Sequence, residues 1–147
     1  MDVKMPSVAG NFGELPELTF PQDCEPPRGL RVQVLIEGDG PVVRAGDEIE
    51  VDYHGQIWNG EIFDSSYYRD TPSIFPIGVG MVIEGWDEAI VGKQVGSRLL
   101  ISVPPFKGYG KAGNPRAGIT GEDILVFVVD IKGLAKSAFD FNSLHDN

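Results

Sequence analysis

The sequence predicts an α+β fold in which a twisted antiparallel sheet of five to six strands wraps around one short helix. Most of the chain alternates apolar and polar residues with a period of two, which is typical of half-buried strands. Only residues 82–92 place apolar side chains at helical spacing, with Ile83, Trp86 and Ile90 on one face. Strands that surround a single short helix favour a sheet whose concave face packs against that helix.

The length of 147 residues fits one domain with two flanking segments. Residues 1–27 are an N-terminal extension rich in proline, a composition that resists regular structure, although residues 18–20 are expected to add a short edge strand. We expect the domain itself to span residues 28–133. Residues 134–147 are mostly polar and predict a loose tail or a frayed helix.

Two strands and a hairpin turn are predicted at the start of the domain. Residues 30–36 form the first strand, and residues 49–58 form the second, with Tyr53 on its core side. Asn59-Gly60 predicts a two-residue type I′ turn, in which both central positions need a positive φ. The returning strand carries Phe63.

The middle of the chain predicts an edge segment followed by the helix. Residues 65–71 indicate a surface loop, and Pro76 places the extended piece after it at an edge of the sheet, because proline cannot donate a ladder hydrogen bond. Asp87 and Glu88 lie in the first helical turn, where the helix dipole favours carboxylates, and Gly92 is placed to end the helix. A helix this short must be stabilised by packing, for which Trp86 is the expected anchor.

Two more strands are predicted in the last part of the domain, separated by a long loop. Residues 98–103 alternate with Leu99 among the core-facing positions, whereas residues 106–123 are glycine-rich and without periodicity. Residues 124–131 are apolar on both faces, as expected of a central strand. In this fold Tyr53, Phe63, Trp86 and Phe127 converge on one apolar site, the usual kind of place for a ligand.

Composition excludes several classes of function. The net charge of −10 disfavours a nucleic-acid partner. The longest apolar run, residues 124–129, is far too short for a bilayer span, and the first residues lack the pattern of a secretory signal. Cys24 is the only cysteine, which favours a reducing, cytoplasmic setting.

Sequence motifs for cofactor, metal or nucleophilic chemistry are weak. Gly108 to Gly113 has the glycine spacing of a dinucleotide-binding turn, but Pro115 and its neighbours cannot start the helix that this motif requires, so we interpret the segment as a loop. Cys24, His54 and His145 are too scattered for a metal site or a catalytic triad, and we expect neither a metal nor a cofactor.

Asp64 lies beside predicted aromatic residues, with Arg69 five positions further on. An ion pair that holds the loop is favoured over acid-base chemistry for this carboxylate, since such pairs are common at surfaces.

Six short motifs occur in order along the chain. They are Val51-Asp52-Tyr53-His54-Gly55, Gly60-Glu61-Ile62-Phe63-Asp64-Ser65-Ser66, Val82-Ile83-Glu84-Gly85-Trp86, Val95-Gly96, Gly108-Tyr109-Gly110 and Leu125-Val126-Phe127. Together they resemble the successive signatures of the FKBP family, the peptidyl-prolyl isomerases that bind the macrolide rapamycin. The resemblance covers residues 29–133, indicates a single-domain member and looks bacterial.

The resemblance implies a peptidyl-prolyl cis-trans isomerase that accelerates rotation of X–Pro bonds in unfolded or flexible chains, without acid-base or metal chemistry. It further implies a monomer whose activity is sensitive to macrolides such as rapamycin. The catalytic residues that it implies are Tyr53, Phe63, Asp64, Trp86, Tyr109 and Phe127. The substrate-binding residues that it implies are Phe75, Val82, Ile83 and Ile119, the last as a lid.

Three features depart from the family's pattern. Ser73 stands where a pocket phenylalanine is usual, Asn114 replaces a common histidine, and residues 116–121 are less apolar than the usual lid. These departures leave open an alternative function, a binding module for proline-containing segments with little or no turnover.

Overall fold

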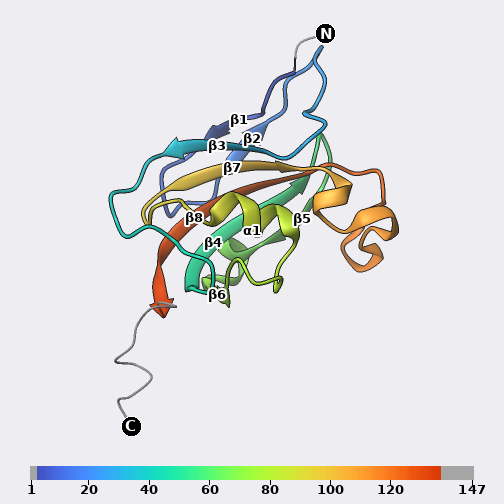
Figure 1. The fold of residues 1–147 in the computed structure, drawn as a ribbon. Helices are drawn as coiled ribbons and strands as arrows, with labels where there is room; N and C mark the ends of the chain where they lie inside the picture. Colours follow the sequence, from blue (N-terminus) through green and yellow to red (C-terminus); the bar gives the residue numbers. More distant parts are fainter. Residues whose placement is uncertain (1–2, 137–147) are drawn as a thin grey trace.

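The computed structural model describes residues 3–136, and its main feature is a six-stranded antiparallel sheet (Figure 1). The strands are β3 (Arg31–Ile36), β4 (Glu48–Ile57), β5 (Ile62–Ser65), β6 (Ser73–Pro76), β7 (Arg98–Val103) and β8 (Leu125–Lys136). Their order is β3-β7-β8-β4-β5, and β6 also pairs with β4. The helix α1 (Glu84–Ile90) lies across one face of the sheet. The predicted α+β fold is therefore confirmed.

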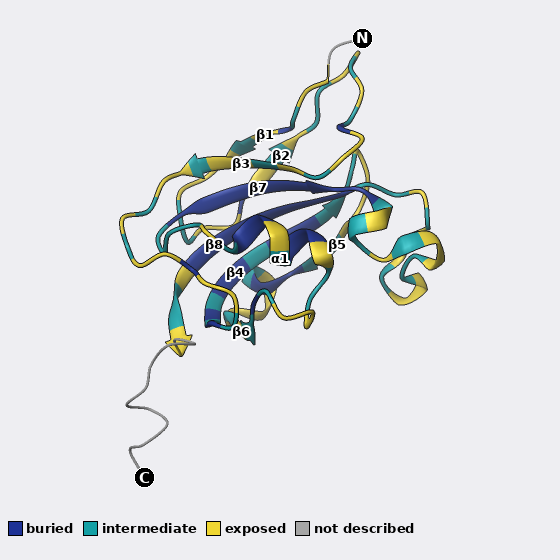
Figure 2. Cartoon of the chain, viewed as in Figure 1, coloured by how far each residue is buried: buried dark blue, intermediate teal, exposed yellow. Residues whose placement is uncertain are grey.

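The two most buried strands lie at the centre of the sheet (Figure 2). All residues of β7 are buried, as is β8 from Leu125 to Ile131, because other parts of the chain pack on both faces of each strand. The central position predicted for residues 124–131 is confirmed. Strand β8 continues to Lys136, into the segment expected to be loose, and residues 137–147, with His145, lie outside the described residues.

Helix α1 is shorter than the predicted span of residues 82–92. Ile83 and Val91, with ψ angles of 146° and 131°, are extended and flank the helix at either end. Trp86, Ala89 and Ile90 are buried and belong to the same core cluster as the inward side chains of β7. The helix is thus held by its apolar face, as its length requires.

The turn between β4 and β5 differs from the predicted type I′ turn. Asn59 has a positive φ of 55°, but Gly60 does not, so that prediction was wrong. The Ile57 amide donates to the Glu61 carbonyl at 2.9 Å, and the Gly60 amide donates to Ile57 at 2.8 Å, which closes a three-residue loop. The longer loop follows from a register shift next to Gly55, which moves the last paired position.

A second, two-stranded sheet covers the other face of the main sheet. Strands β1 (Ser7–Ala9) and β2 (Glu17–Thr19) pair with each other. A strand does form near the predicted residues 18–20, at Glu17–Thr19, but it pairs with β1 and does not join the edge of the main sheet. The second core cluster joins the buried Leu100, Val126 and Val128 to side chains of the extension, among them Met5, Val8, Leu18 and Phe20.

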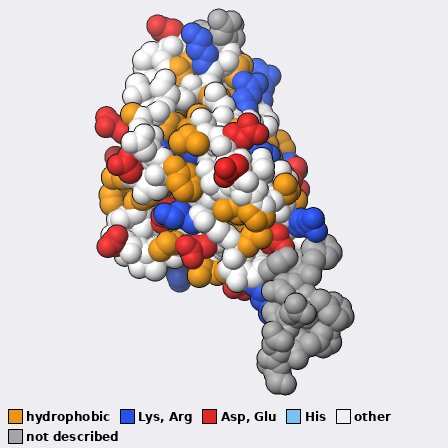
Figure 3. Space-filling model, turned by 90° about the vertical axis from the view of Figure 1, so that its left-hand side faces the viewer, with side chains coloured by type: hydrophobic (Ala, Val, Ile, Leu, Met, Phe, Trp, Pro, Cys, Tyr) orange, Lys and Arg blue, Asp and Glu red, His pale blue; other side chains and the backbone are white. Residues whose placement is uncertain are grey.

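The long glycine-rich segment contains three short 3-10 turns and projects from one end of the sheet (Figure 1). They are η2 (Pro105–Lys107), η3 (Gly110–Ala112) and η4 (Pro115–Ala117). The turn η1 (Ser66–Arg69) occupies the predicted loop between β5 and β6. The face drawn in Figure 3 shows acidic side chains scattered over it, with hydrophobic side chains between them. Within residues 3–136, no helix has both the length and the apolarity needed to cross a bilayer.

Candidate functional site

A cavity of about 530 Å³ opens at the N-terminal end of α1. Its walls come from β4, β5, β6, the residues just before and inside α1, the loop after β7, and β8. The lining residues are Tyr53, Phe63, Asp64, Ser73, Phe75, Gly80, Met81, Val82, Ile83, Trp86, Tyr109 and Phe127. The cavity is thus built mainly from aromatic and aliphatic side chains, with one carboxylate, the usual composition of a small-molecule site.

Trp86 forms the centre of the aromatic lining. Its ring is 5.1 Å from that of Tyr53 and 5.2 Å from that of Phe127, both in edge-to-face geometry, and 5.5 Å from that of Phe75. Phe63 meets Phe127 edge-to-face at 5.5 Å. Trp86 is only 5% exposed, so these contacts fix the indole firmly.

The polar side of the cavity is a hydrogen-bonded group of three residues. The Tyr53 hydroxyl donates to Asp64, and Arg69 donates to Asp64 at 2.5 Å and to the Tyr53 oxygen at 3.0 Å. The guanidinium also lies 5.6 Å from the centre of the Tyr53 ring. The ion pair predicted between Asp64 and Arg69 is present, and Asp64 itself lines the cavity beside Tyr53.

This group keeps Asp64 ionised and Tyr53 neutral. Partial burial alone would raise the pKa of Asp64, but hydrogen bonds from Tyr53 and Arg69 outweigh it and hold that pKa below its usual value of 3.8. Burial, together with the Asp64 carboxylate, raises the pKa of Tyr53 above its usual value of 10.0. Neither group is poised to exchange a proton near neutral pH.

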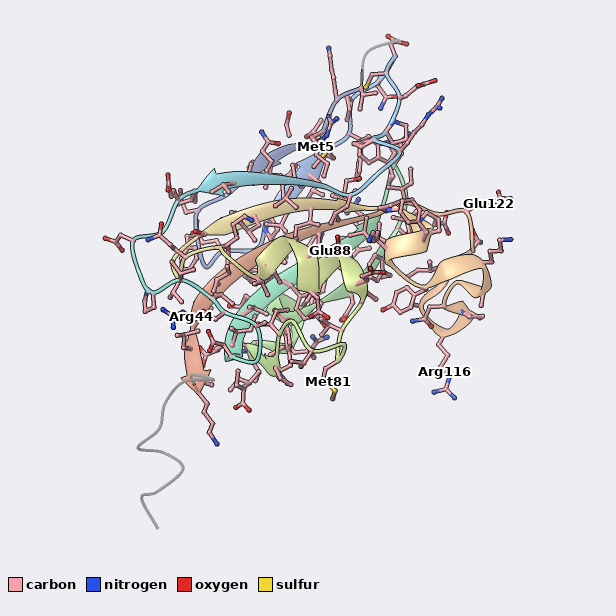
Figure 4. The ribbon with its side chains drawn as sticks, in the orientation of Figure 1. Met5, Arg44, Met81, Glu88, Arg116 and Glu122 are labelled. Atoms are coloured by element: carbon pink, nitrogen blue, oxygen red, sulfur yellow. The ribbon has the colours of Figure 1, made fainter. Side chains whose placement is uncertain are left out.

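The cavity's rim is set by two loops. Met81, which is 68% exposed, projects from the loop before α1 (Figure 4). The Asp87 carboxylate ties this loop to the helix by accepting hydrogen bonds from the Gly78 and Gly80 amides at 2.6 and 3.0 Å. On the other side, Lys107 pairs with Glu84 and Glu88 of α1 at 3.0 and 2.7 Å.

The structure brings together nine of the ten predicted site residues in the cavity lining, all except Ile119. Ile119 is 4% exposed, packs in the main core and does not line the cavity. Its amide is hydrogen-bonded to the Asn114 carbonyl at 3.0 Å, and Asn114 also lies outside the lining. Arg116 projects from η4, away from the body of the molecule (Figure 4).

Sequence reasoning missed two lining residues, Gly80 and Met81. Their position immediately before Val82 and Ile83 was the available signal, because a loop that leads into a cavity-lining segment borders the same cavity. Ser73, noted in the sequence as a departure, does line the cavity.

His54 is placed away from this chemistry. It is buried with its Nδ1 3.2 Å from the Ser65 hydroxyl and its Nε2 3.3 Å from Gln56 Oε1, and it does not line the cavity. Burial lowers the pKa of His54 below its usual value of 6.5. Residues 3–136 hold no group of three or more His, Cys, Asp or Glu side chains arranged to bind a metal ion.

Comparisons with known proteins all point to the same family. Residues 40–132 match the sequence model of the FKBP-type peptidyl-prolyl cis-trans isomerases. The FK506-binding protein of Streptomyces anulatus is 41% identical over 119 residues, which cover 80% of this chain and 95% of that relative. The chloroplastic peptidyl-prolyl cis-trans isomerase FKBP13 of Arabidopsis thaliana is 36% identical over 138 residues, covering 86% of this chain and 65% of that protein.

A solved structure agrees with the sequence comparison. The crystal structure of AtFKBP13 matches with a TM-score of 0.68 at 35% identity, over 74% of this chain and 95% of the solved one. The fold, the aromatic cavity and these matches lead to one conclusion: the chain belongs to the FKBP family of peptidyl-prolyl cis-trans isomerases.

Proposed function

We propose that the chain catalyses X–Pro isomerisation in the cavity floored by Trp86, with the substrate proline ring stacked on the indole. The observation that carries this assignment is the aromatic enclosure itself, in which Tyr53, Phe75 and Phe127 pack around one buried tryptophan. The cavity volume of about 530 Å³ lies in the usual range of small-ligand sites, which supports a site for one proline and its immediate neighbours.

The proposed mechanism depends on removing water from the amide. Rotation about the X–Pro bond faces a barrier of ~20 kcal/mol, since amide resonance is lost in the twisted state. The planar amide is more dipolar than the twisted one, so an apolar enclosure disfavours the planar form more strongly. Trp86, Phe63 and Phe127 supply that enclosure, and binding of the twisted amide lowers the barrier.

Two groups are proposed to orient the substrate's carbonyls. Ile83 directly precedes α1, where backbone amides have no acceptor within the helix. Tyr109 lines the cavity at its rim. We assign the Ile83 amide and the Tyr109 hydroxyl as donors to the carbonyls of the bound peptide.

Asp64 has an electrostatic role in this proposal. Its carboxylate accepts hydrogen bonds from Tyr53 and Arg69, and the positive charge of Arg69 balances its negative charge. Asp64 therefore stays ionised, with its pKa below the usual value. It polarises the Tyr53 side of the cavity and holds the Tyr53 ring against Trp86.

Ligands, partners and location are proposed from the relatives and from the composition. The relatives are named for binding FK506, and we propose that FK506 and rapamycin occupy the same cavity as the proline. The net charge of −10 disfavours a nucleic-acid partner. We further propose a cytoplasmic location, with which a single cysteine that has no disulfide partner is consistent, and a monomer that acts on unfolded or flexible chains.

The test is isomerisation of a short Phe-Pro or Leu-Pro peptide, measured with and without rapamycin. Acceleration that a stoichiometric amount of rapamycin abolishes is the expected result. Unchanged rates at micromolar protein would refute the assignment.

A second candidate function is a proline-segment binding module, and Ser73 in the cavity wall favours it by leaving the enclosure less aromatic. Calorimetry with the same peptide separates the two functions. Binding without acceleration supports the module, and a Ser73→Phe variant that gains turnover would identify the missing wall as its cause.

A further inference from the structure

The turn η1 lies beside the cavity and is anchored at two points on the main sheet. The Ser66 hydroxyl accepts a hydrogen bond from the Tyr53 amide at 2.8 Å, which fixes the start of the turn to β4. The Tyr67 hydroxyl donates to Asp130 on β8. The last residue of the turn, Arg69, is the one that reaches the cavity's carboxylate.

The second anchor is a buried ion pair. Arg98 and Asp130 are 1% and 0% exposed, and Arg98 donates to the two carboxylate oxygens at 2.7 and 3.0 Å. The same carboxylate also accepts from Tyr67 and from the Gly13 amide, the latter at 2.8 Å. A buried pair is stable only when its remaining donors and acceptors are satisfied in this way.

The N-terminal extension supplies the remaining hydrogen bonds to the buried ion pair. Residues 10–14, here called the strap, place the Gly10 and Glu14 carbonyls 3.1 and 2.5 Å from Arg98. Together with the Gly13 amide, they give the buried pair three backbone hydrogen bonds from a segment more than eighty positions away in sequence. The strap and η1 therefore meet at one carboxylate.

We propose that Tyr67 is a positioning residue through which the strap holds Arg69 against Asp64 and Tyr53, so that residues 10–14 influence turnover in a cavity they do not touch. The part concerning turnover rests on the proposed isomerase function. The link is short: the strap and Tyr67 share the Asp130 carboxylate, and Tyr67 is two residues before Arg69. A four-residue turn that loses one of its anchors no longer fixes the side chain at its end.

The first test is Tyr67→Phe in the full-length chain, which keeps the ring and removes only the hydroxyl. Tyr68→Phe is the matched control, since Tyr68 is the next residue and is 63% exposed. We expect kcat for a Phe-Pro peptide to fall about 3- to 10-fold in Tyr67→Phe with less than about twofold change in KM. The control should match the wild type.

The second readout needs no substrate. Carbon-13 resonances of the carboxyl groups, followed over pH, report the protonation of Asp64. We expect the pKa of Asp64 to move up toward its usual value in Tyr67→Phe, because Arg69 spends less time against the carboxylate. A residue with only a structural role would lower the melting temperature and leave this titration in place.

The third variant changes a residue of the strap. Gly13→Pro removes the amide that donates to Asp130, at a position whose φ of +84° proline cannot adopt, and it touches no cavity residue. It should shift the Asp64 titration in the same direction as Tyr67→Phe, and the double variant should add little. The proposal would be overturned if either single variant left the pKa of Asp64 unchanged. It would also be overturned if the two shifts in this pKa added fully in the double variant. A wild-type chain without isomerase activity would refute the proposed function, and the titration would still decide the coupling.

Discussion

At the scale of single residues, Trp86 serves both the core and the cavity. It is 5% exposed and contacts three other aromatic rings, so the cavity floor is packed as part of the core. Its indole nitrogen has no hydrogen-bond partner within residues 3–136, so the side chain contributes through its ring rather than through a polar contact. We therefore expect catalysis and stability to depend on the same side chain.

Trp86→Leu should lower both activity and stability, whereas the same change at the other tryptophan should lower stability alone. We expect kcat/KM to fall at least about tenfold, with a loss of about 2–4 kcal/mol in the free energy of unfolding. Trp58→Leu is the control: Trp58 packs on Phe20 on the opposite face of the sheet and should lose stability without losing kcat/KM. Full activity in a folded Trp86→Leu protein would contradict the assigned floor.

The titrating groups of the cavity predict a flat pH profile. With the pKa of Asp64 held below 3.8 and that of Tyr53 raised above 10.0, kcat/KM should stay constant from about pH 5 to pH 9. The stability contributed by Asp64 is present above its unfolded pKa and is lost as pH falls through its lower folded value. Activity should decline in that acid range, and Asp64→Asn should remove the decline. A bell-shaped profile centred near neutrality would instead indicate acid-base catalysis.

At the scale of elements, a single glycine lets two strands bring their aromatic rings together. A Cβ added at Gly55 of β4 would lie 2.7 and 2.8 Å from atoms of Phe63 and 3.0 Å from Phe127. Gly55 is required for space and not for backbone conformation, since its φ lies outside the positive region. The cavity's far wall therefore depends on β4 as much as on the two strands that carry the rings.

Gly55→Ala should displace the Phe63 and Phe127 rings and lower kcat/KM about 5- to 50-fold, together with the affinity for rapamycin. Gly133→Ala, on β8 with open space around its added Cβ, is the matched control and should change neither quantity. Peptide assays and calorimetry on both variants check this. Equal activity in the two variants would show that the wall tolerates the shift.

At the scale of the whole molecule, the N-terminal extension is part of the folded unit. Leu18 and Phe20 pack against Leu100, Val126 and Val128, all three fully buried, on the face of the sheet opposite α1. The main sheet thus has a cluster of apolar side chains on each face, as expected for central strands that are buried on both sides.

Leu18→Ala should therefore lower the free energy of unfolding by about 1–3 kcal/mol. Leu15→Ala, in the same segment but 45% exposed, should change it by less than about 0.5 kcal/mol. Guanidinium denaturation of both variants measures the difference. Equal midpoints would mean that the extension contributes no core.

The sequence predicted the parts of this molecule that depend on local pattern. The alternation in residues 30–36 and the two apolar faces of residues 124–131 predicted β3 and the central place of β8. The prediction of a type I′ turn at Asn59-Gly60 was wrong because the bulge next to Gly55, which depends on how β4 and β5 pair, sets the loop length. The pairing of Arg98 with Asp130 and with the strap was not predictable, since its partners are 32 to 88 positions away. Nor was the inward packing of Ile119.

Exchange NMR on a Phe-Pro peptide with substoichiometric protein, combined with the two indole N–H resonances of the protein, tests whether isomerisation takes place over Trp86. We expect cis-trans exchange peaks that rapamycin removes, together with a peptide-dependent shift of the Trp86 indole resonance and no shift of the Trp58 indole resonance. Exchange peaks accompanied by an unmoved Trp86 resonance would place the reaction elsewhere on the molecule and contradict the account.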